Sequence, residues 1–315
     1  MNARAWTLFA IVSALWGIPY LFIKLAVEDL SPTWVALGRI LVAFAVLLPL
    51  ALRRGAFRGL RAHWKVLAVY SLVEITLPWP LIGFGEQRVS SGLTAILIAA
   101  VPLVVALMAL RIDAEERAEG SRLAGLLVGF AGVVVLLGVD VVGRPGELLG
   151  AGAILLATVG YAAGPLIIKH RFSDLQPLGV VTASMGISAL LLAPFAATSV
   201  PTAVPSEQAL ASVAVLGVAC SAIAFLAFFA LIATVGPGRA TIITYVNPVV
   251  AVALGVALLG EGIGPSAVAG LLLILAGSWL STGGRLPPGL MTRIAPGRAA
   301  RAAPDLHVRA QAPPV

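Results

Sequence analysis

Charged residues are scarce in this chain of 315 residues, where Asp, Glu, Lys and Arg together make up only 11%. A soluble domain of average composition carries about 25% charged residues. So few polar groups cannot cover the surface of a soluble fold of this length. Hydrophobic residues make up 60% of the chain, and this excess also excludes disorder of the chain as a whole. We therefore expect an integral membrane protein.

Cysteine and histidine are nearly absent. The single cysteine, Cys220, excludes an internal disulfide, and we expect it to be a small packed residue. The three histidines, His63, His170 and His307, fall in predicted loops or in the tail, which leaves no zinc site. Neither a Walker A loop, a G-x-S-x-G turn nor an H-E-x-x-H pair occurs. We expect no metal, no cofactor and no enzymatic activity, with an intramembrane enzyme as a less favoured alternative.

Long apolar segments fill most of the chain. A membrane-spanning helix needs about 20 predominantly apolar residues, and continuous apolar runs without period-2 alternation indicate helices rather than barrel strands. The first segment has no clear cleavage site, so we expect it to be a retained span. The predicted spans are 5–27, 33–52, 64–84, 90–111, 121–139, 147–168, 177–197, 209–235, 238–259 and 264–282. The sequence thus predicts an all-α membrane protein with ten transmembrane helices.

The basic residues indicate an orientation, because cytoplasmic loops of membrane proteins carry an excess of Lys and Arg. If the N-terminus is cytoplasmic, 17 of the 21 basic residues fall inside, three fall outside, and Arg39 lies within the second span. We therefore expect both termini to be cytoplasmic, in the plasma (inner) membrane. The net charge of +7 is then a consequence of topology, and we expect no nucleic-acid partner. The tail, 285–315, is predicted to be disordered and cytoplasmic.

The two halves of the chain repeat each other. Residues 16–49 align with 161–194 at a constant offset of 145, which places Lys24 on Lys169 and Pro32 on Pro177. Each unit, 5–140 and 147–283, holds five predicted helices. Because five is odd, the second unit enters the membrane from the opposite side. Inverted repeats are typical of transporters that work by alternating access, with a substrate site near the midplane.

Several short motifs recur in both halves, and with them the sequence resembles the EamA-type members of the drug/metabolite transporter superfamily. The motifs are Trp16-Gly17, Lys24 and Arg39; Ser91-Gly92, Pro102 and Glu115; and Gly236-Pro237-Gly238, Pro248 and Gly260-Glu261. The chain reads Ala114-Glu115-Glu116 where the family usually has Gly-Glu-Arg. The resemblance covers 5–283. It implies a ten-helix bundle of two inverted five-helix repeats that exports or takes up small metabolites, often amino acids or related amphipathic solutes, without ATP hydrolysis.

Two charged residues lie within predicted spans, where such residues usually face a cavity or a partner. Arg39 is a candidate for attracting a substrate carboxylate. The alternatives are that it reaches the outer interface or pairs with Glu28, Asp29 or Glu86. Glu74 lies near mid-bilayer, and removal from water favours the neutral form of a carboxyl group. It is our candidate for proton coupling, the alternative being a protonated packing residue or a partner of Arg39.

Prolines, aromatic residues and polar residues complete the candidate substrate site. Paired prolines that interrupt corresponding spans are the best sequence pointer to a transporter site, although they could merely improve packing. Aromatic walls with polar tips suit an amphipathic solute, whereas each aromatic residue alone is explained by helix packing. The glycine pairs Gly125-x-x-x-Gly129 and Gly160-x-x-x-Gly164 are predicted to be packing surfaces. Besides Arg39 and Glu74, the candidates are Trp16, Tyr20, Trp79, Pro102, Tyr161, Thr241, Tyr245, Asn247 and Pro248.

These observations predict a secondary transporter that moves small organic metabolites by alternating access. Efflux is favoured by the resemblance alone. An uptake facilitator and a passive channel remain alternatives. The expected partners are a small-molecule substrate and the lipid bilayer, while the oligomeric state is left open.

Overall fold

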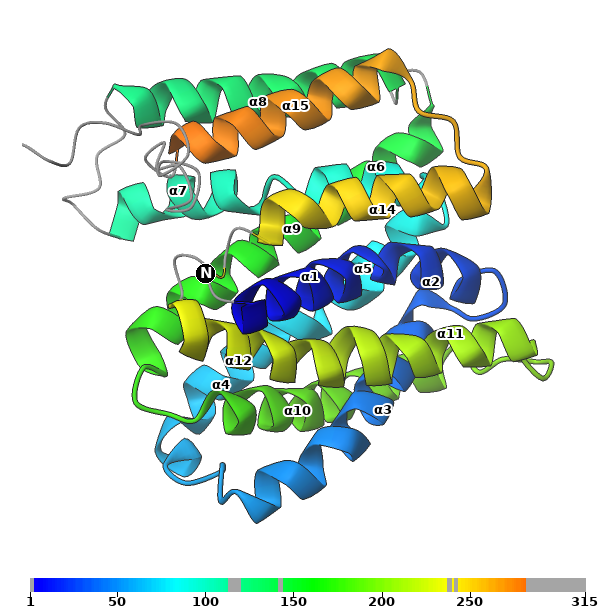
Figure 1. Ribbon diagram of the computed structural model, residues 1–315. Coiled ribbons are helices and arrows are strands. Elements are labelled where there is room, and N and C mark those ends of the chain that lie inside the picture. The colour runs from blue at the N-terminus through cyan, green and yellow to red at the C-terminus, as the bar shows by residue number, and fades with distance from the viewer. Residues whose placement is uncertain (1–2, 113–119, 141–143, 237–239, 241–242, 282–315) are drawn as a thin grey trace, which may run out of the picture. The chain divides into compact units, whose positions relative to one another are not determined.

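The computed structural model describes residues 3–112, 120–140, 144–236, 240 and 243–281, and in these residues all regular structure is helical. The first half contains α1 Ala3–Gly17, α2 Pro19–Ala26, α3 Pro32–Arg53, η1 Leu60–His63, α4 Trp64–Ser71, η2 Leu72–Thr76, α5 Pro78–Glu86, α6 Ser91–Ile98, α7 Val101–Ile112 and α8 Ser121–Asp140. The second half contains α9 Pro145–Arg171, α10 Pro177–Ala197, α11 Glu207–Gly217, η3 Val218–Ile223, α12 Ala224–Val235, α14 Ile243–Leu259 and α15 Pro265–Ser281. Figure 1 shows these helices following the chain from blue to orange.

Seven helical segments of the described chain are long and apolar enough to cross a membrane. Three shorter apolar helices, Ser121–Leu137, Ile243–Leu259 and Pro265–Ser281, lie within the predicted spans 121–139, 238–259 and 264–282. The expectation of an all-helical membrane fold is therefore confirmed. Residues 113–119, 241–242 and 282–315, which include Glu115, Thr241 and the predicted tail, lie outside the described residues.

The ends of several helices follow directly from the local sequence. Proline is the first residue of α3, α9, α10 and α15, a position where its missing N–H costs no helical hydrogen bond. Serine side chains cap the first turns of α3, α6 and α11: Ser31 accepts from Trp34 N, Ser90 from Leu93 N and Ser206 from Ala209 N. These caps satisfy backbone donors that the helix itself leaves unpaired.

Four membrane segments are irregular in the middle. The first breaks at Ile18 before Pro19, and the fourth breaks at Ala99 and Ala100 before Pro102, as expected for a residue that cannot donate a backbone hydrogen bond. The π-helical turn η2 lies between α4 and α5, and the π-helical turn η3 lies between α11 and α12. Such turns are rare and occur often at functional sites.

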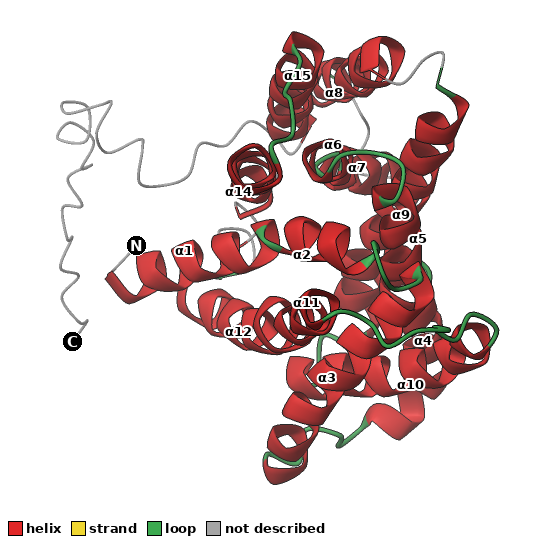
Figure 2. Ribbon diagram, turned by 90° about the vertical axis from the view of Figure 1, so that its right-hand side faces the viewer, coloured by secondary structure: helices red, strands yellow, loops and turns green. Residues whose placement is uncertain are grey.

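The helices pack in pairs drawn largely from opposite halves of the chain. The most extensive contact joins α8 to α15, followed by α3 with α10 and α5 with α9. The helices α1 and α2 pack on α12 and α11, and α6 packs on α14. Figure 2 shows α8 and α15 side by side, next to α6, α7 and α14. Both α5 and η3 pack on α3, and α9 packs on α5, which positions the site described below.

Glycines permit the tight contact between α8 and α15. A Cβ atom at Gly125 would come within 2.7 Å of the carbonyl oxygen of Gly277, and one at Gly277 would overlap the backbone of Gly129. On another surface, a Cβ atom at Gly160 would overlap the carbonyl oxygen of Val73. The prediction that the two glycine pairs are packing surfaces is therefore confirmed.

Candidate functional site

Five polar and aromatic residues from separate segments meet in the interior, and we call Tyr20, Arg39, Trp79, Tyr161 and Ser221 the Arg39 cluster. They come from α2, α3, α5, α9 and η3. The guanidinium carbon of Arg39 lies 3.8 Å from the centroid of the Trp79 ring, and Arg39 Nε donates to Ser221 Oγ at 2.9 Å. Tyr20 and Tyr161 lie within electrostatic range of Arg39. The cluster therefore combines a cation with three aromatic side chains and a hydroxyl group.

Arg39 is buried, with an exposed fraction of 8%, and carries no ion pair to any described carboxylate. Its two Nη groups make no hydrogen bond, so only Nε and the face on Trp79 are engaged. The alternatives that Arg39 reaches the interface or pairs with Glu28, Asp29 or Glu86 are wrong. A buried cation needs compensation, and the free Nη groups are suited to a bidentate contact with a carboxylate.

The π-helical turns explain how a serine comes to hold Arg39. In η3, Ser221 Oγ donates to the carbonyl oxygen of Leu216 at 2.9 Å, and in η2 Thr76 Oγ1 donates to that of Ser71 at 3.0 Å. Each hydroxyl thus satisfies a carbonyl at the π turn, and Thr76 and Ser221 are separated by the repeat offset of 145. Ser221 was not a candidate from the sequence, because its contact with Arg39 arises from tertiary packing.

Glu74 lies on η2 and faces α9 rather than Arg39. Its Oε2 atom is enclosed and has no hydrogen-bond partner, and a Cβ atom at Gly164 would overlap it. Tyr70 and Tyr161 lie within its electrostatic range. Since no ion pair joins Glu74 to Arg39, the interpretation of Glu74 as the partner of Arg39 is wrong. Tyr161 lies within electrostatic range of both Glu74 and Arg39.

The other predicted site residues lie outside the Arg39 cluster. Trp16 packs on Phe225 and Phe228, with ring centroids 5.6 and 4.7 Å away. Asn247 donates, in its favourable amide orientation, to the carbonyls of Ile243 at 2.9 Å and Ser13 at 3.2 Å. Trp16 thus contacts aromatic side chains and Asn247 bonds the backbone.

The two paired prolines lie in different surroundings. Pro102 is half-buried at the start of α7, whereas Pro248 is buried within α14, three residues after Tyr245. Pro102 therefore follows a break in its span, and Pro248 lies inside a continuous helix.

Hydrogen bonds between the two halves tie one end of the bundle. We call this the distal end; it carries residues 27–31, 87–90, 198–206 and 260–264. Ser31 Oγ lies 3.0 Å from Ser199 Oγ, and Asp29 Oδ2 accepts from Ser206 N at 3.1 Å. The hydrogen bonds from the side chain and backbone of Ser206 lower the pKa of Asp29 below its ordinary value. Asp29 therefore stays ionised at neutral pH, and its contribution is lost only as the pH falls through that lowered pKa.

Glu261 caps the first turn of α6 across 169 to 170 residues of chain. Its Oε1 accepts from Ser91 N at 2.7 Å, and its Oε2 accepts from Ser91 Oγ and Gly92 N, both at 3.0 Å. A Cβ atom at Gly255 would overlap Glu261 Oε2, so the glycine is needed for this approach. Carboxylates are stabilised at a helix N-terminus by the free N–H groups and the helix dipole. Glu261 thereby fastens the segment between α14 and α15 onto α6.

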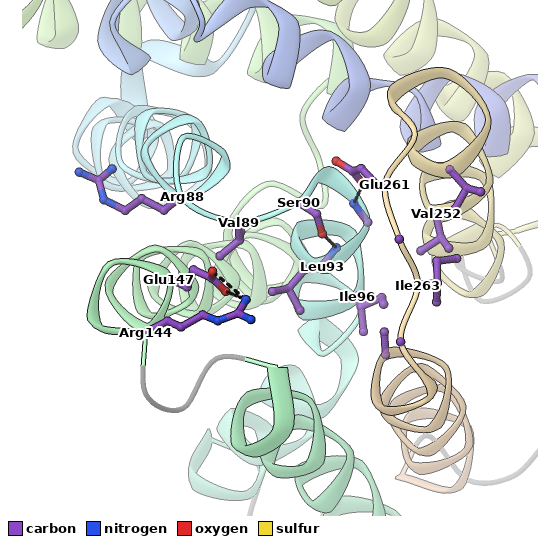
Figure 3. Close-up of a pocket in the computed structure, with 15 residues that line it drawn as sticks. Arg88, Val89, Ser90, Leu93, Ile96, Arg144, Glu147, Val252, Glu261 and Ile263 are labelled. Carbon is purple, nitrogen blue, oxygen red and sulfur yellow. Dashed lines mark hydrogen bonds and ion pairs between the residues drawn. The ribbon is translucent and has the colours of Figure 1, made fainter.

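A cavity of about 360 Å³ opens beside this cap (Figure 3). Apolar residues of α6 and α14, among them Leu93, Ile96 and Val252, form its walls. On another wall Arg144 and Glu147 form an ion pair of 3.1 Å, which Figure 3 marks with a dashed line. None of these residues was a candidate from the sequence, because a cavity formed by several segments has no local signal.

Glu86, at the end of α5, is a second residue that the sequence analysis did not place in a site. It is fully buried, and neither carboxyl oxygen has a hydrogen-bond partner. Lys24 Nζ donates instead to the backbone carbonyls of Glu86, at 2.5 Å, and Val89, at 2.9 Å. The predicted span ended at residue 84, whereas α5 continues to 86. Glu86 therefore lies in the protein interior, beyond the end of its predicted span.

Comparison with known proteins identifies the family. The model of the EamA-like transporter family matches residues 4–138 and, a second time, residues 148–283. The chain belongs to the EamA-like transporter family. A relative described as an "Uncharacterized transporter" of Archaeoglobus fulgidus is 26% identical to this EamA-like chain over 285 residues, which cover 88% of the chain and 98% of the relative.

Two further comparisons agree with this assignment. The "Uncharacterized inner membrane transporter YedA" of Escherichia coli (strain K12) is 31% identical to the EamA-like chain over 253 residues, 78% of the chain and 80% of the relative. A solved crystal structure, 21% identical in sequence, covers 93% of the chain and 99% of its own with a TM-score of 0.64, which shows a shared fold. This EamA-like protein is thus a multi-pass membrane transporter, with a small molecule as its substrate and the bilayer as its surroundings.

Proposed function

We propose that the chain is a secondary carrier of small organic metabolites that works by alternating access, and that the Arg39 cluster binds the substrate. The observation that carries this proposal is a buried Arg39 that has no carboxylate partner and free Nη groups. A substrate carboxylate supplies the missing charge and occupies both groups. Tyr20, Trp79 and Tyr161 then flank the apolar part of an amphipathic solute.

The proposed architecture is a pair of inverted five-helix repeats, 5–140 and 147–283, which form ten spanning helices. Three observations support it. The family model matches the two halves separately, and π-helical turns occur at corresponding places in both. In addition, the packing of α5 on α9 has its counterpart in the packing of α12 on α1, as a two-fold relation between the repeats requires.

The proposed orientation places both termini in the cytoplasm and the distal end outside, in the plasma (inner) membrane. The described basic residues support it: Arg53, Arg54, Arg58, Arg61, Lys65, Lys169 and Arg171 lie at the opposite end from Lys24, Arg88 and Arg144. Cytoplasmic ends of membrane helices are the ends enriched in such residues. The tail, 285–315, is then cytoplasmic. Efflux is the proposed direction, on the resemblance to the family.

Substrate binding should stabilise the purified protein, by an amount that grows with the logarithm of ligand concentration above Kd. We expect carboxylate-bearing amphipathic solutes, amino acids and their analogues among them, to raise the melting temperature of the detergent-solubilised protein. The control compounds are aromatic cations without a carboxyl group. The positive charge of Arg39 repels such cations. Stabilisation by the cations alone would contradict the assignment of the Arg39 cluster as the binding site.

Glu74 is the proposed proton-coupling residue, because its enclosed Oε2 faces α9 without a hydrogen-bond partner. During the cycle its carboxyl group gains and loses a proton while the substrate moves. We expect Glu74→Gln to retain substrate exchange at equal pH in proteoliposomes. It should lose the uptake or release that a proton gradient drives. Unchanged gradient-driven accumulation in the variant would show that coupling does not involve Glu74.

A further inference from the structure

Glu86 combines two features that a static structural role does not explain. Its side chain has an exposed fraction of 0%, and both of its carboxyl oxygens lack a hydrogen-bond partner. Buried polar groups in proteins are almost always hydrogen-bonded. An ionised carboxylate without donors is among the costliest groups to enclose.

The neighbours of Glu86 do not supply the missing donor. From α2, Lys24 uses its ammonium group on two backbone carbonyls and forms no ion pair with the carboxylate, and Tyr20 lies within electrostatic range. From α3, Arg39 lies within range but donates through Nε to Ser221. From the segment after α14, Glu261 adds a negative charge that repels a second one. Two cations and one anion thus lie near Glu86, and none of them is hydrogen-bonded to its carboxyl group.

Glu86 also lies next to the contacts that hold the distal end together. Lys24 holds the loop after α5 through the carbonyl of Val89, and Glu261 holds the first turn of α6 two residues further along. On the side of α9, a Cβ atom at Gly85 would come within 3.0 Å of the Gly150 carbonyl oxygen, so the helices leave no room there. Because the exposed fraction of Glu86 is 0%, water does not reach its carboxyl group in this arrangement, and separation of the neighbouring distal contacts would admit it.

We propose that Glu86 is a proton-binding site that controls the distal closure. In the closed arrangement Glu86 holds its proton. When the O–H bond breaks, the proton passes to water of the distal compartment, no electrons are exchanged, and the resulting carboxylate favours the open, hydrated arrangement. Acid therefore closes the distal end and alkali opens it. This site is separate from Glu74, and the inference concerns the protein whether or not the proposed carrier function holds.

The test measures opening directly, without a substrate. The chain's only cysteine, Cys220, is buried, so Cys220→Ala with Ile96→Cys supplies one reporter thiol. Ile96 is 2% exposed on α6 and lines the cavity of about 360 Å³ beside the Glu261 cap. Purified protein in detergent is labelled with a small maleimide between pH 6 and 8, and the rates are corrected for thiol ionisation with an exposed cysteine peptide.

We expect the corrected labelling rate to rise with pH, by at most about tenfold per pH unit for a single proton. Glu86→Gln, which imitates the protonated form, should label slowly and at one rate throughout this pH range. Glu86→Asp should keep the pH dependence, and it covers the case in which the glutamine variant fails to fold. The matched control Glu147→Gln, a distal carboxyl group already paired with Arg144, should behave as the reporter protein does.

A reporter protein whose labelling does not depend on pH would overturn the proposal. So would a folded Glu86→Gln variant that keeps the full pH dependence, or a Glu261→Gln variant that alone abolishes it. A failure of transport assays would leave this experiment unaffected, so the failure of this proposal and that of the carrier function are distinguishable.

Discussion

Replacing Arg39 with glutamine should strongly weaken carboxylate-dependent transport while leaving the protein folded. Truncating one partner of a buried, hydrogen-bonded charge pair costs 2–5 kcal/mol or more. Because each 1.4 kcal/mol corresponds to a factor of ten, we expect substrate affinity to fall roughly 30-fold or more. The measurement is the substrate concentration that half-saturates exchange in proteoliposomes, together with the maximal rate.

Two further variants separate charge from geometry. Arg39→Lys keeps the positive charge but loses the planar group that stacks on Trp79 and the second Nη donor, since lysine does not reproduce bidentate arginine contacts. It should retain only part of the affinity. Arg88→Gln is the matched control, because Arg88 lies over the Phe84 ring at the distal end, outside the Arg39 cluster. If Arg39→Gln transported as well as Arg88→Gln does, the Arg39 cluster would not be the substrate site.

The second large effect concerns stability. Gly277→Val should prevent α15 from docking on α8, because even the Cβ atom would overlap the backbone of Gly129 and approach the Gly125 carbonyl oxygen to 2.6 Å. Overpacking of flexible side chains costs about 1–3 kcal/mol, and a backbone obstacle cannot rotate away. We expect a loss of about 3 kcal/mol or more, seen as a large fall in folded yield and melting temperature in detergent.

The control for this variant is Gly152→Val on α9, where a Cβ atom meets no neighbour within 4 Å. It carries the same side chain and the same loss of glycine in an apolar helix. We expect a near-normal folded yield for Gly152→Val. Equal behaviour of the two variants would show that the close approach of α8 and α15 does not stabilise the fold.

The sequence alone predicted the helical membrane fold, because hydrophobic run length and the placement of Lys and Arg respond to the bilayer itself. It also placed Arg39 and Glu74 within their spans, since a charge in an apolar run is visible without any neighbour. What it could not supply were contacts between spans. That Arg39 stacks on Trp79 rather than pairing with Glu74 depends on how α3, α5 and α9 pack.

Two residues show different reasons for such omissions. Ser221 is a small polar residue in an apolar segment, where most serines simply bond their own backbone, as Ser184 does to Val180. Its contact with Arg39 arises only from tertiary packing. Glu86 lay beyond the predicted span, which ended at residue 84, and its burial depends on how α5 packs on its neighbours.

Counterflow in proteoliposomes tests the central claim most directly. Liposomes containing the purified protein are loaded with an unlabelled carboxylate-bearing solute that stabilises it, and entry of the labelled solute is followed at equal pH without a membrane potential. An alternating-access carrier predicts saturable entry with a transient overshoot, stimulated by the solute inside. Entry that rises linearly with concentration and does not respond to the internal solute would contradict the account and indicate a passive channel.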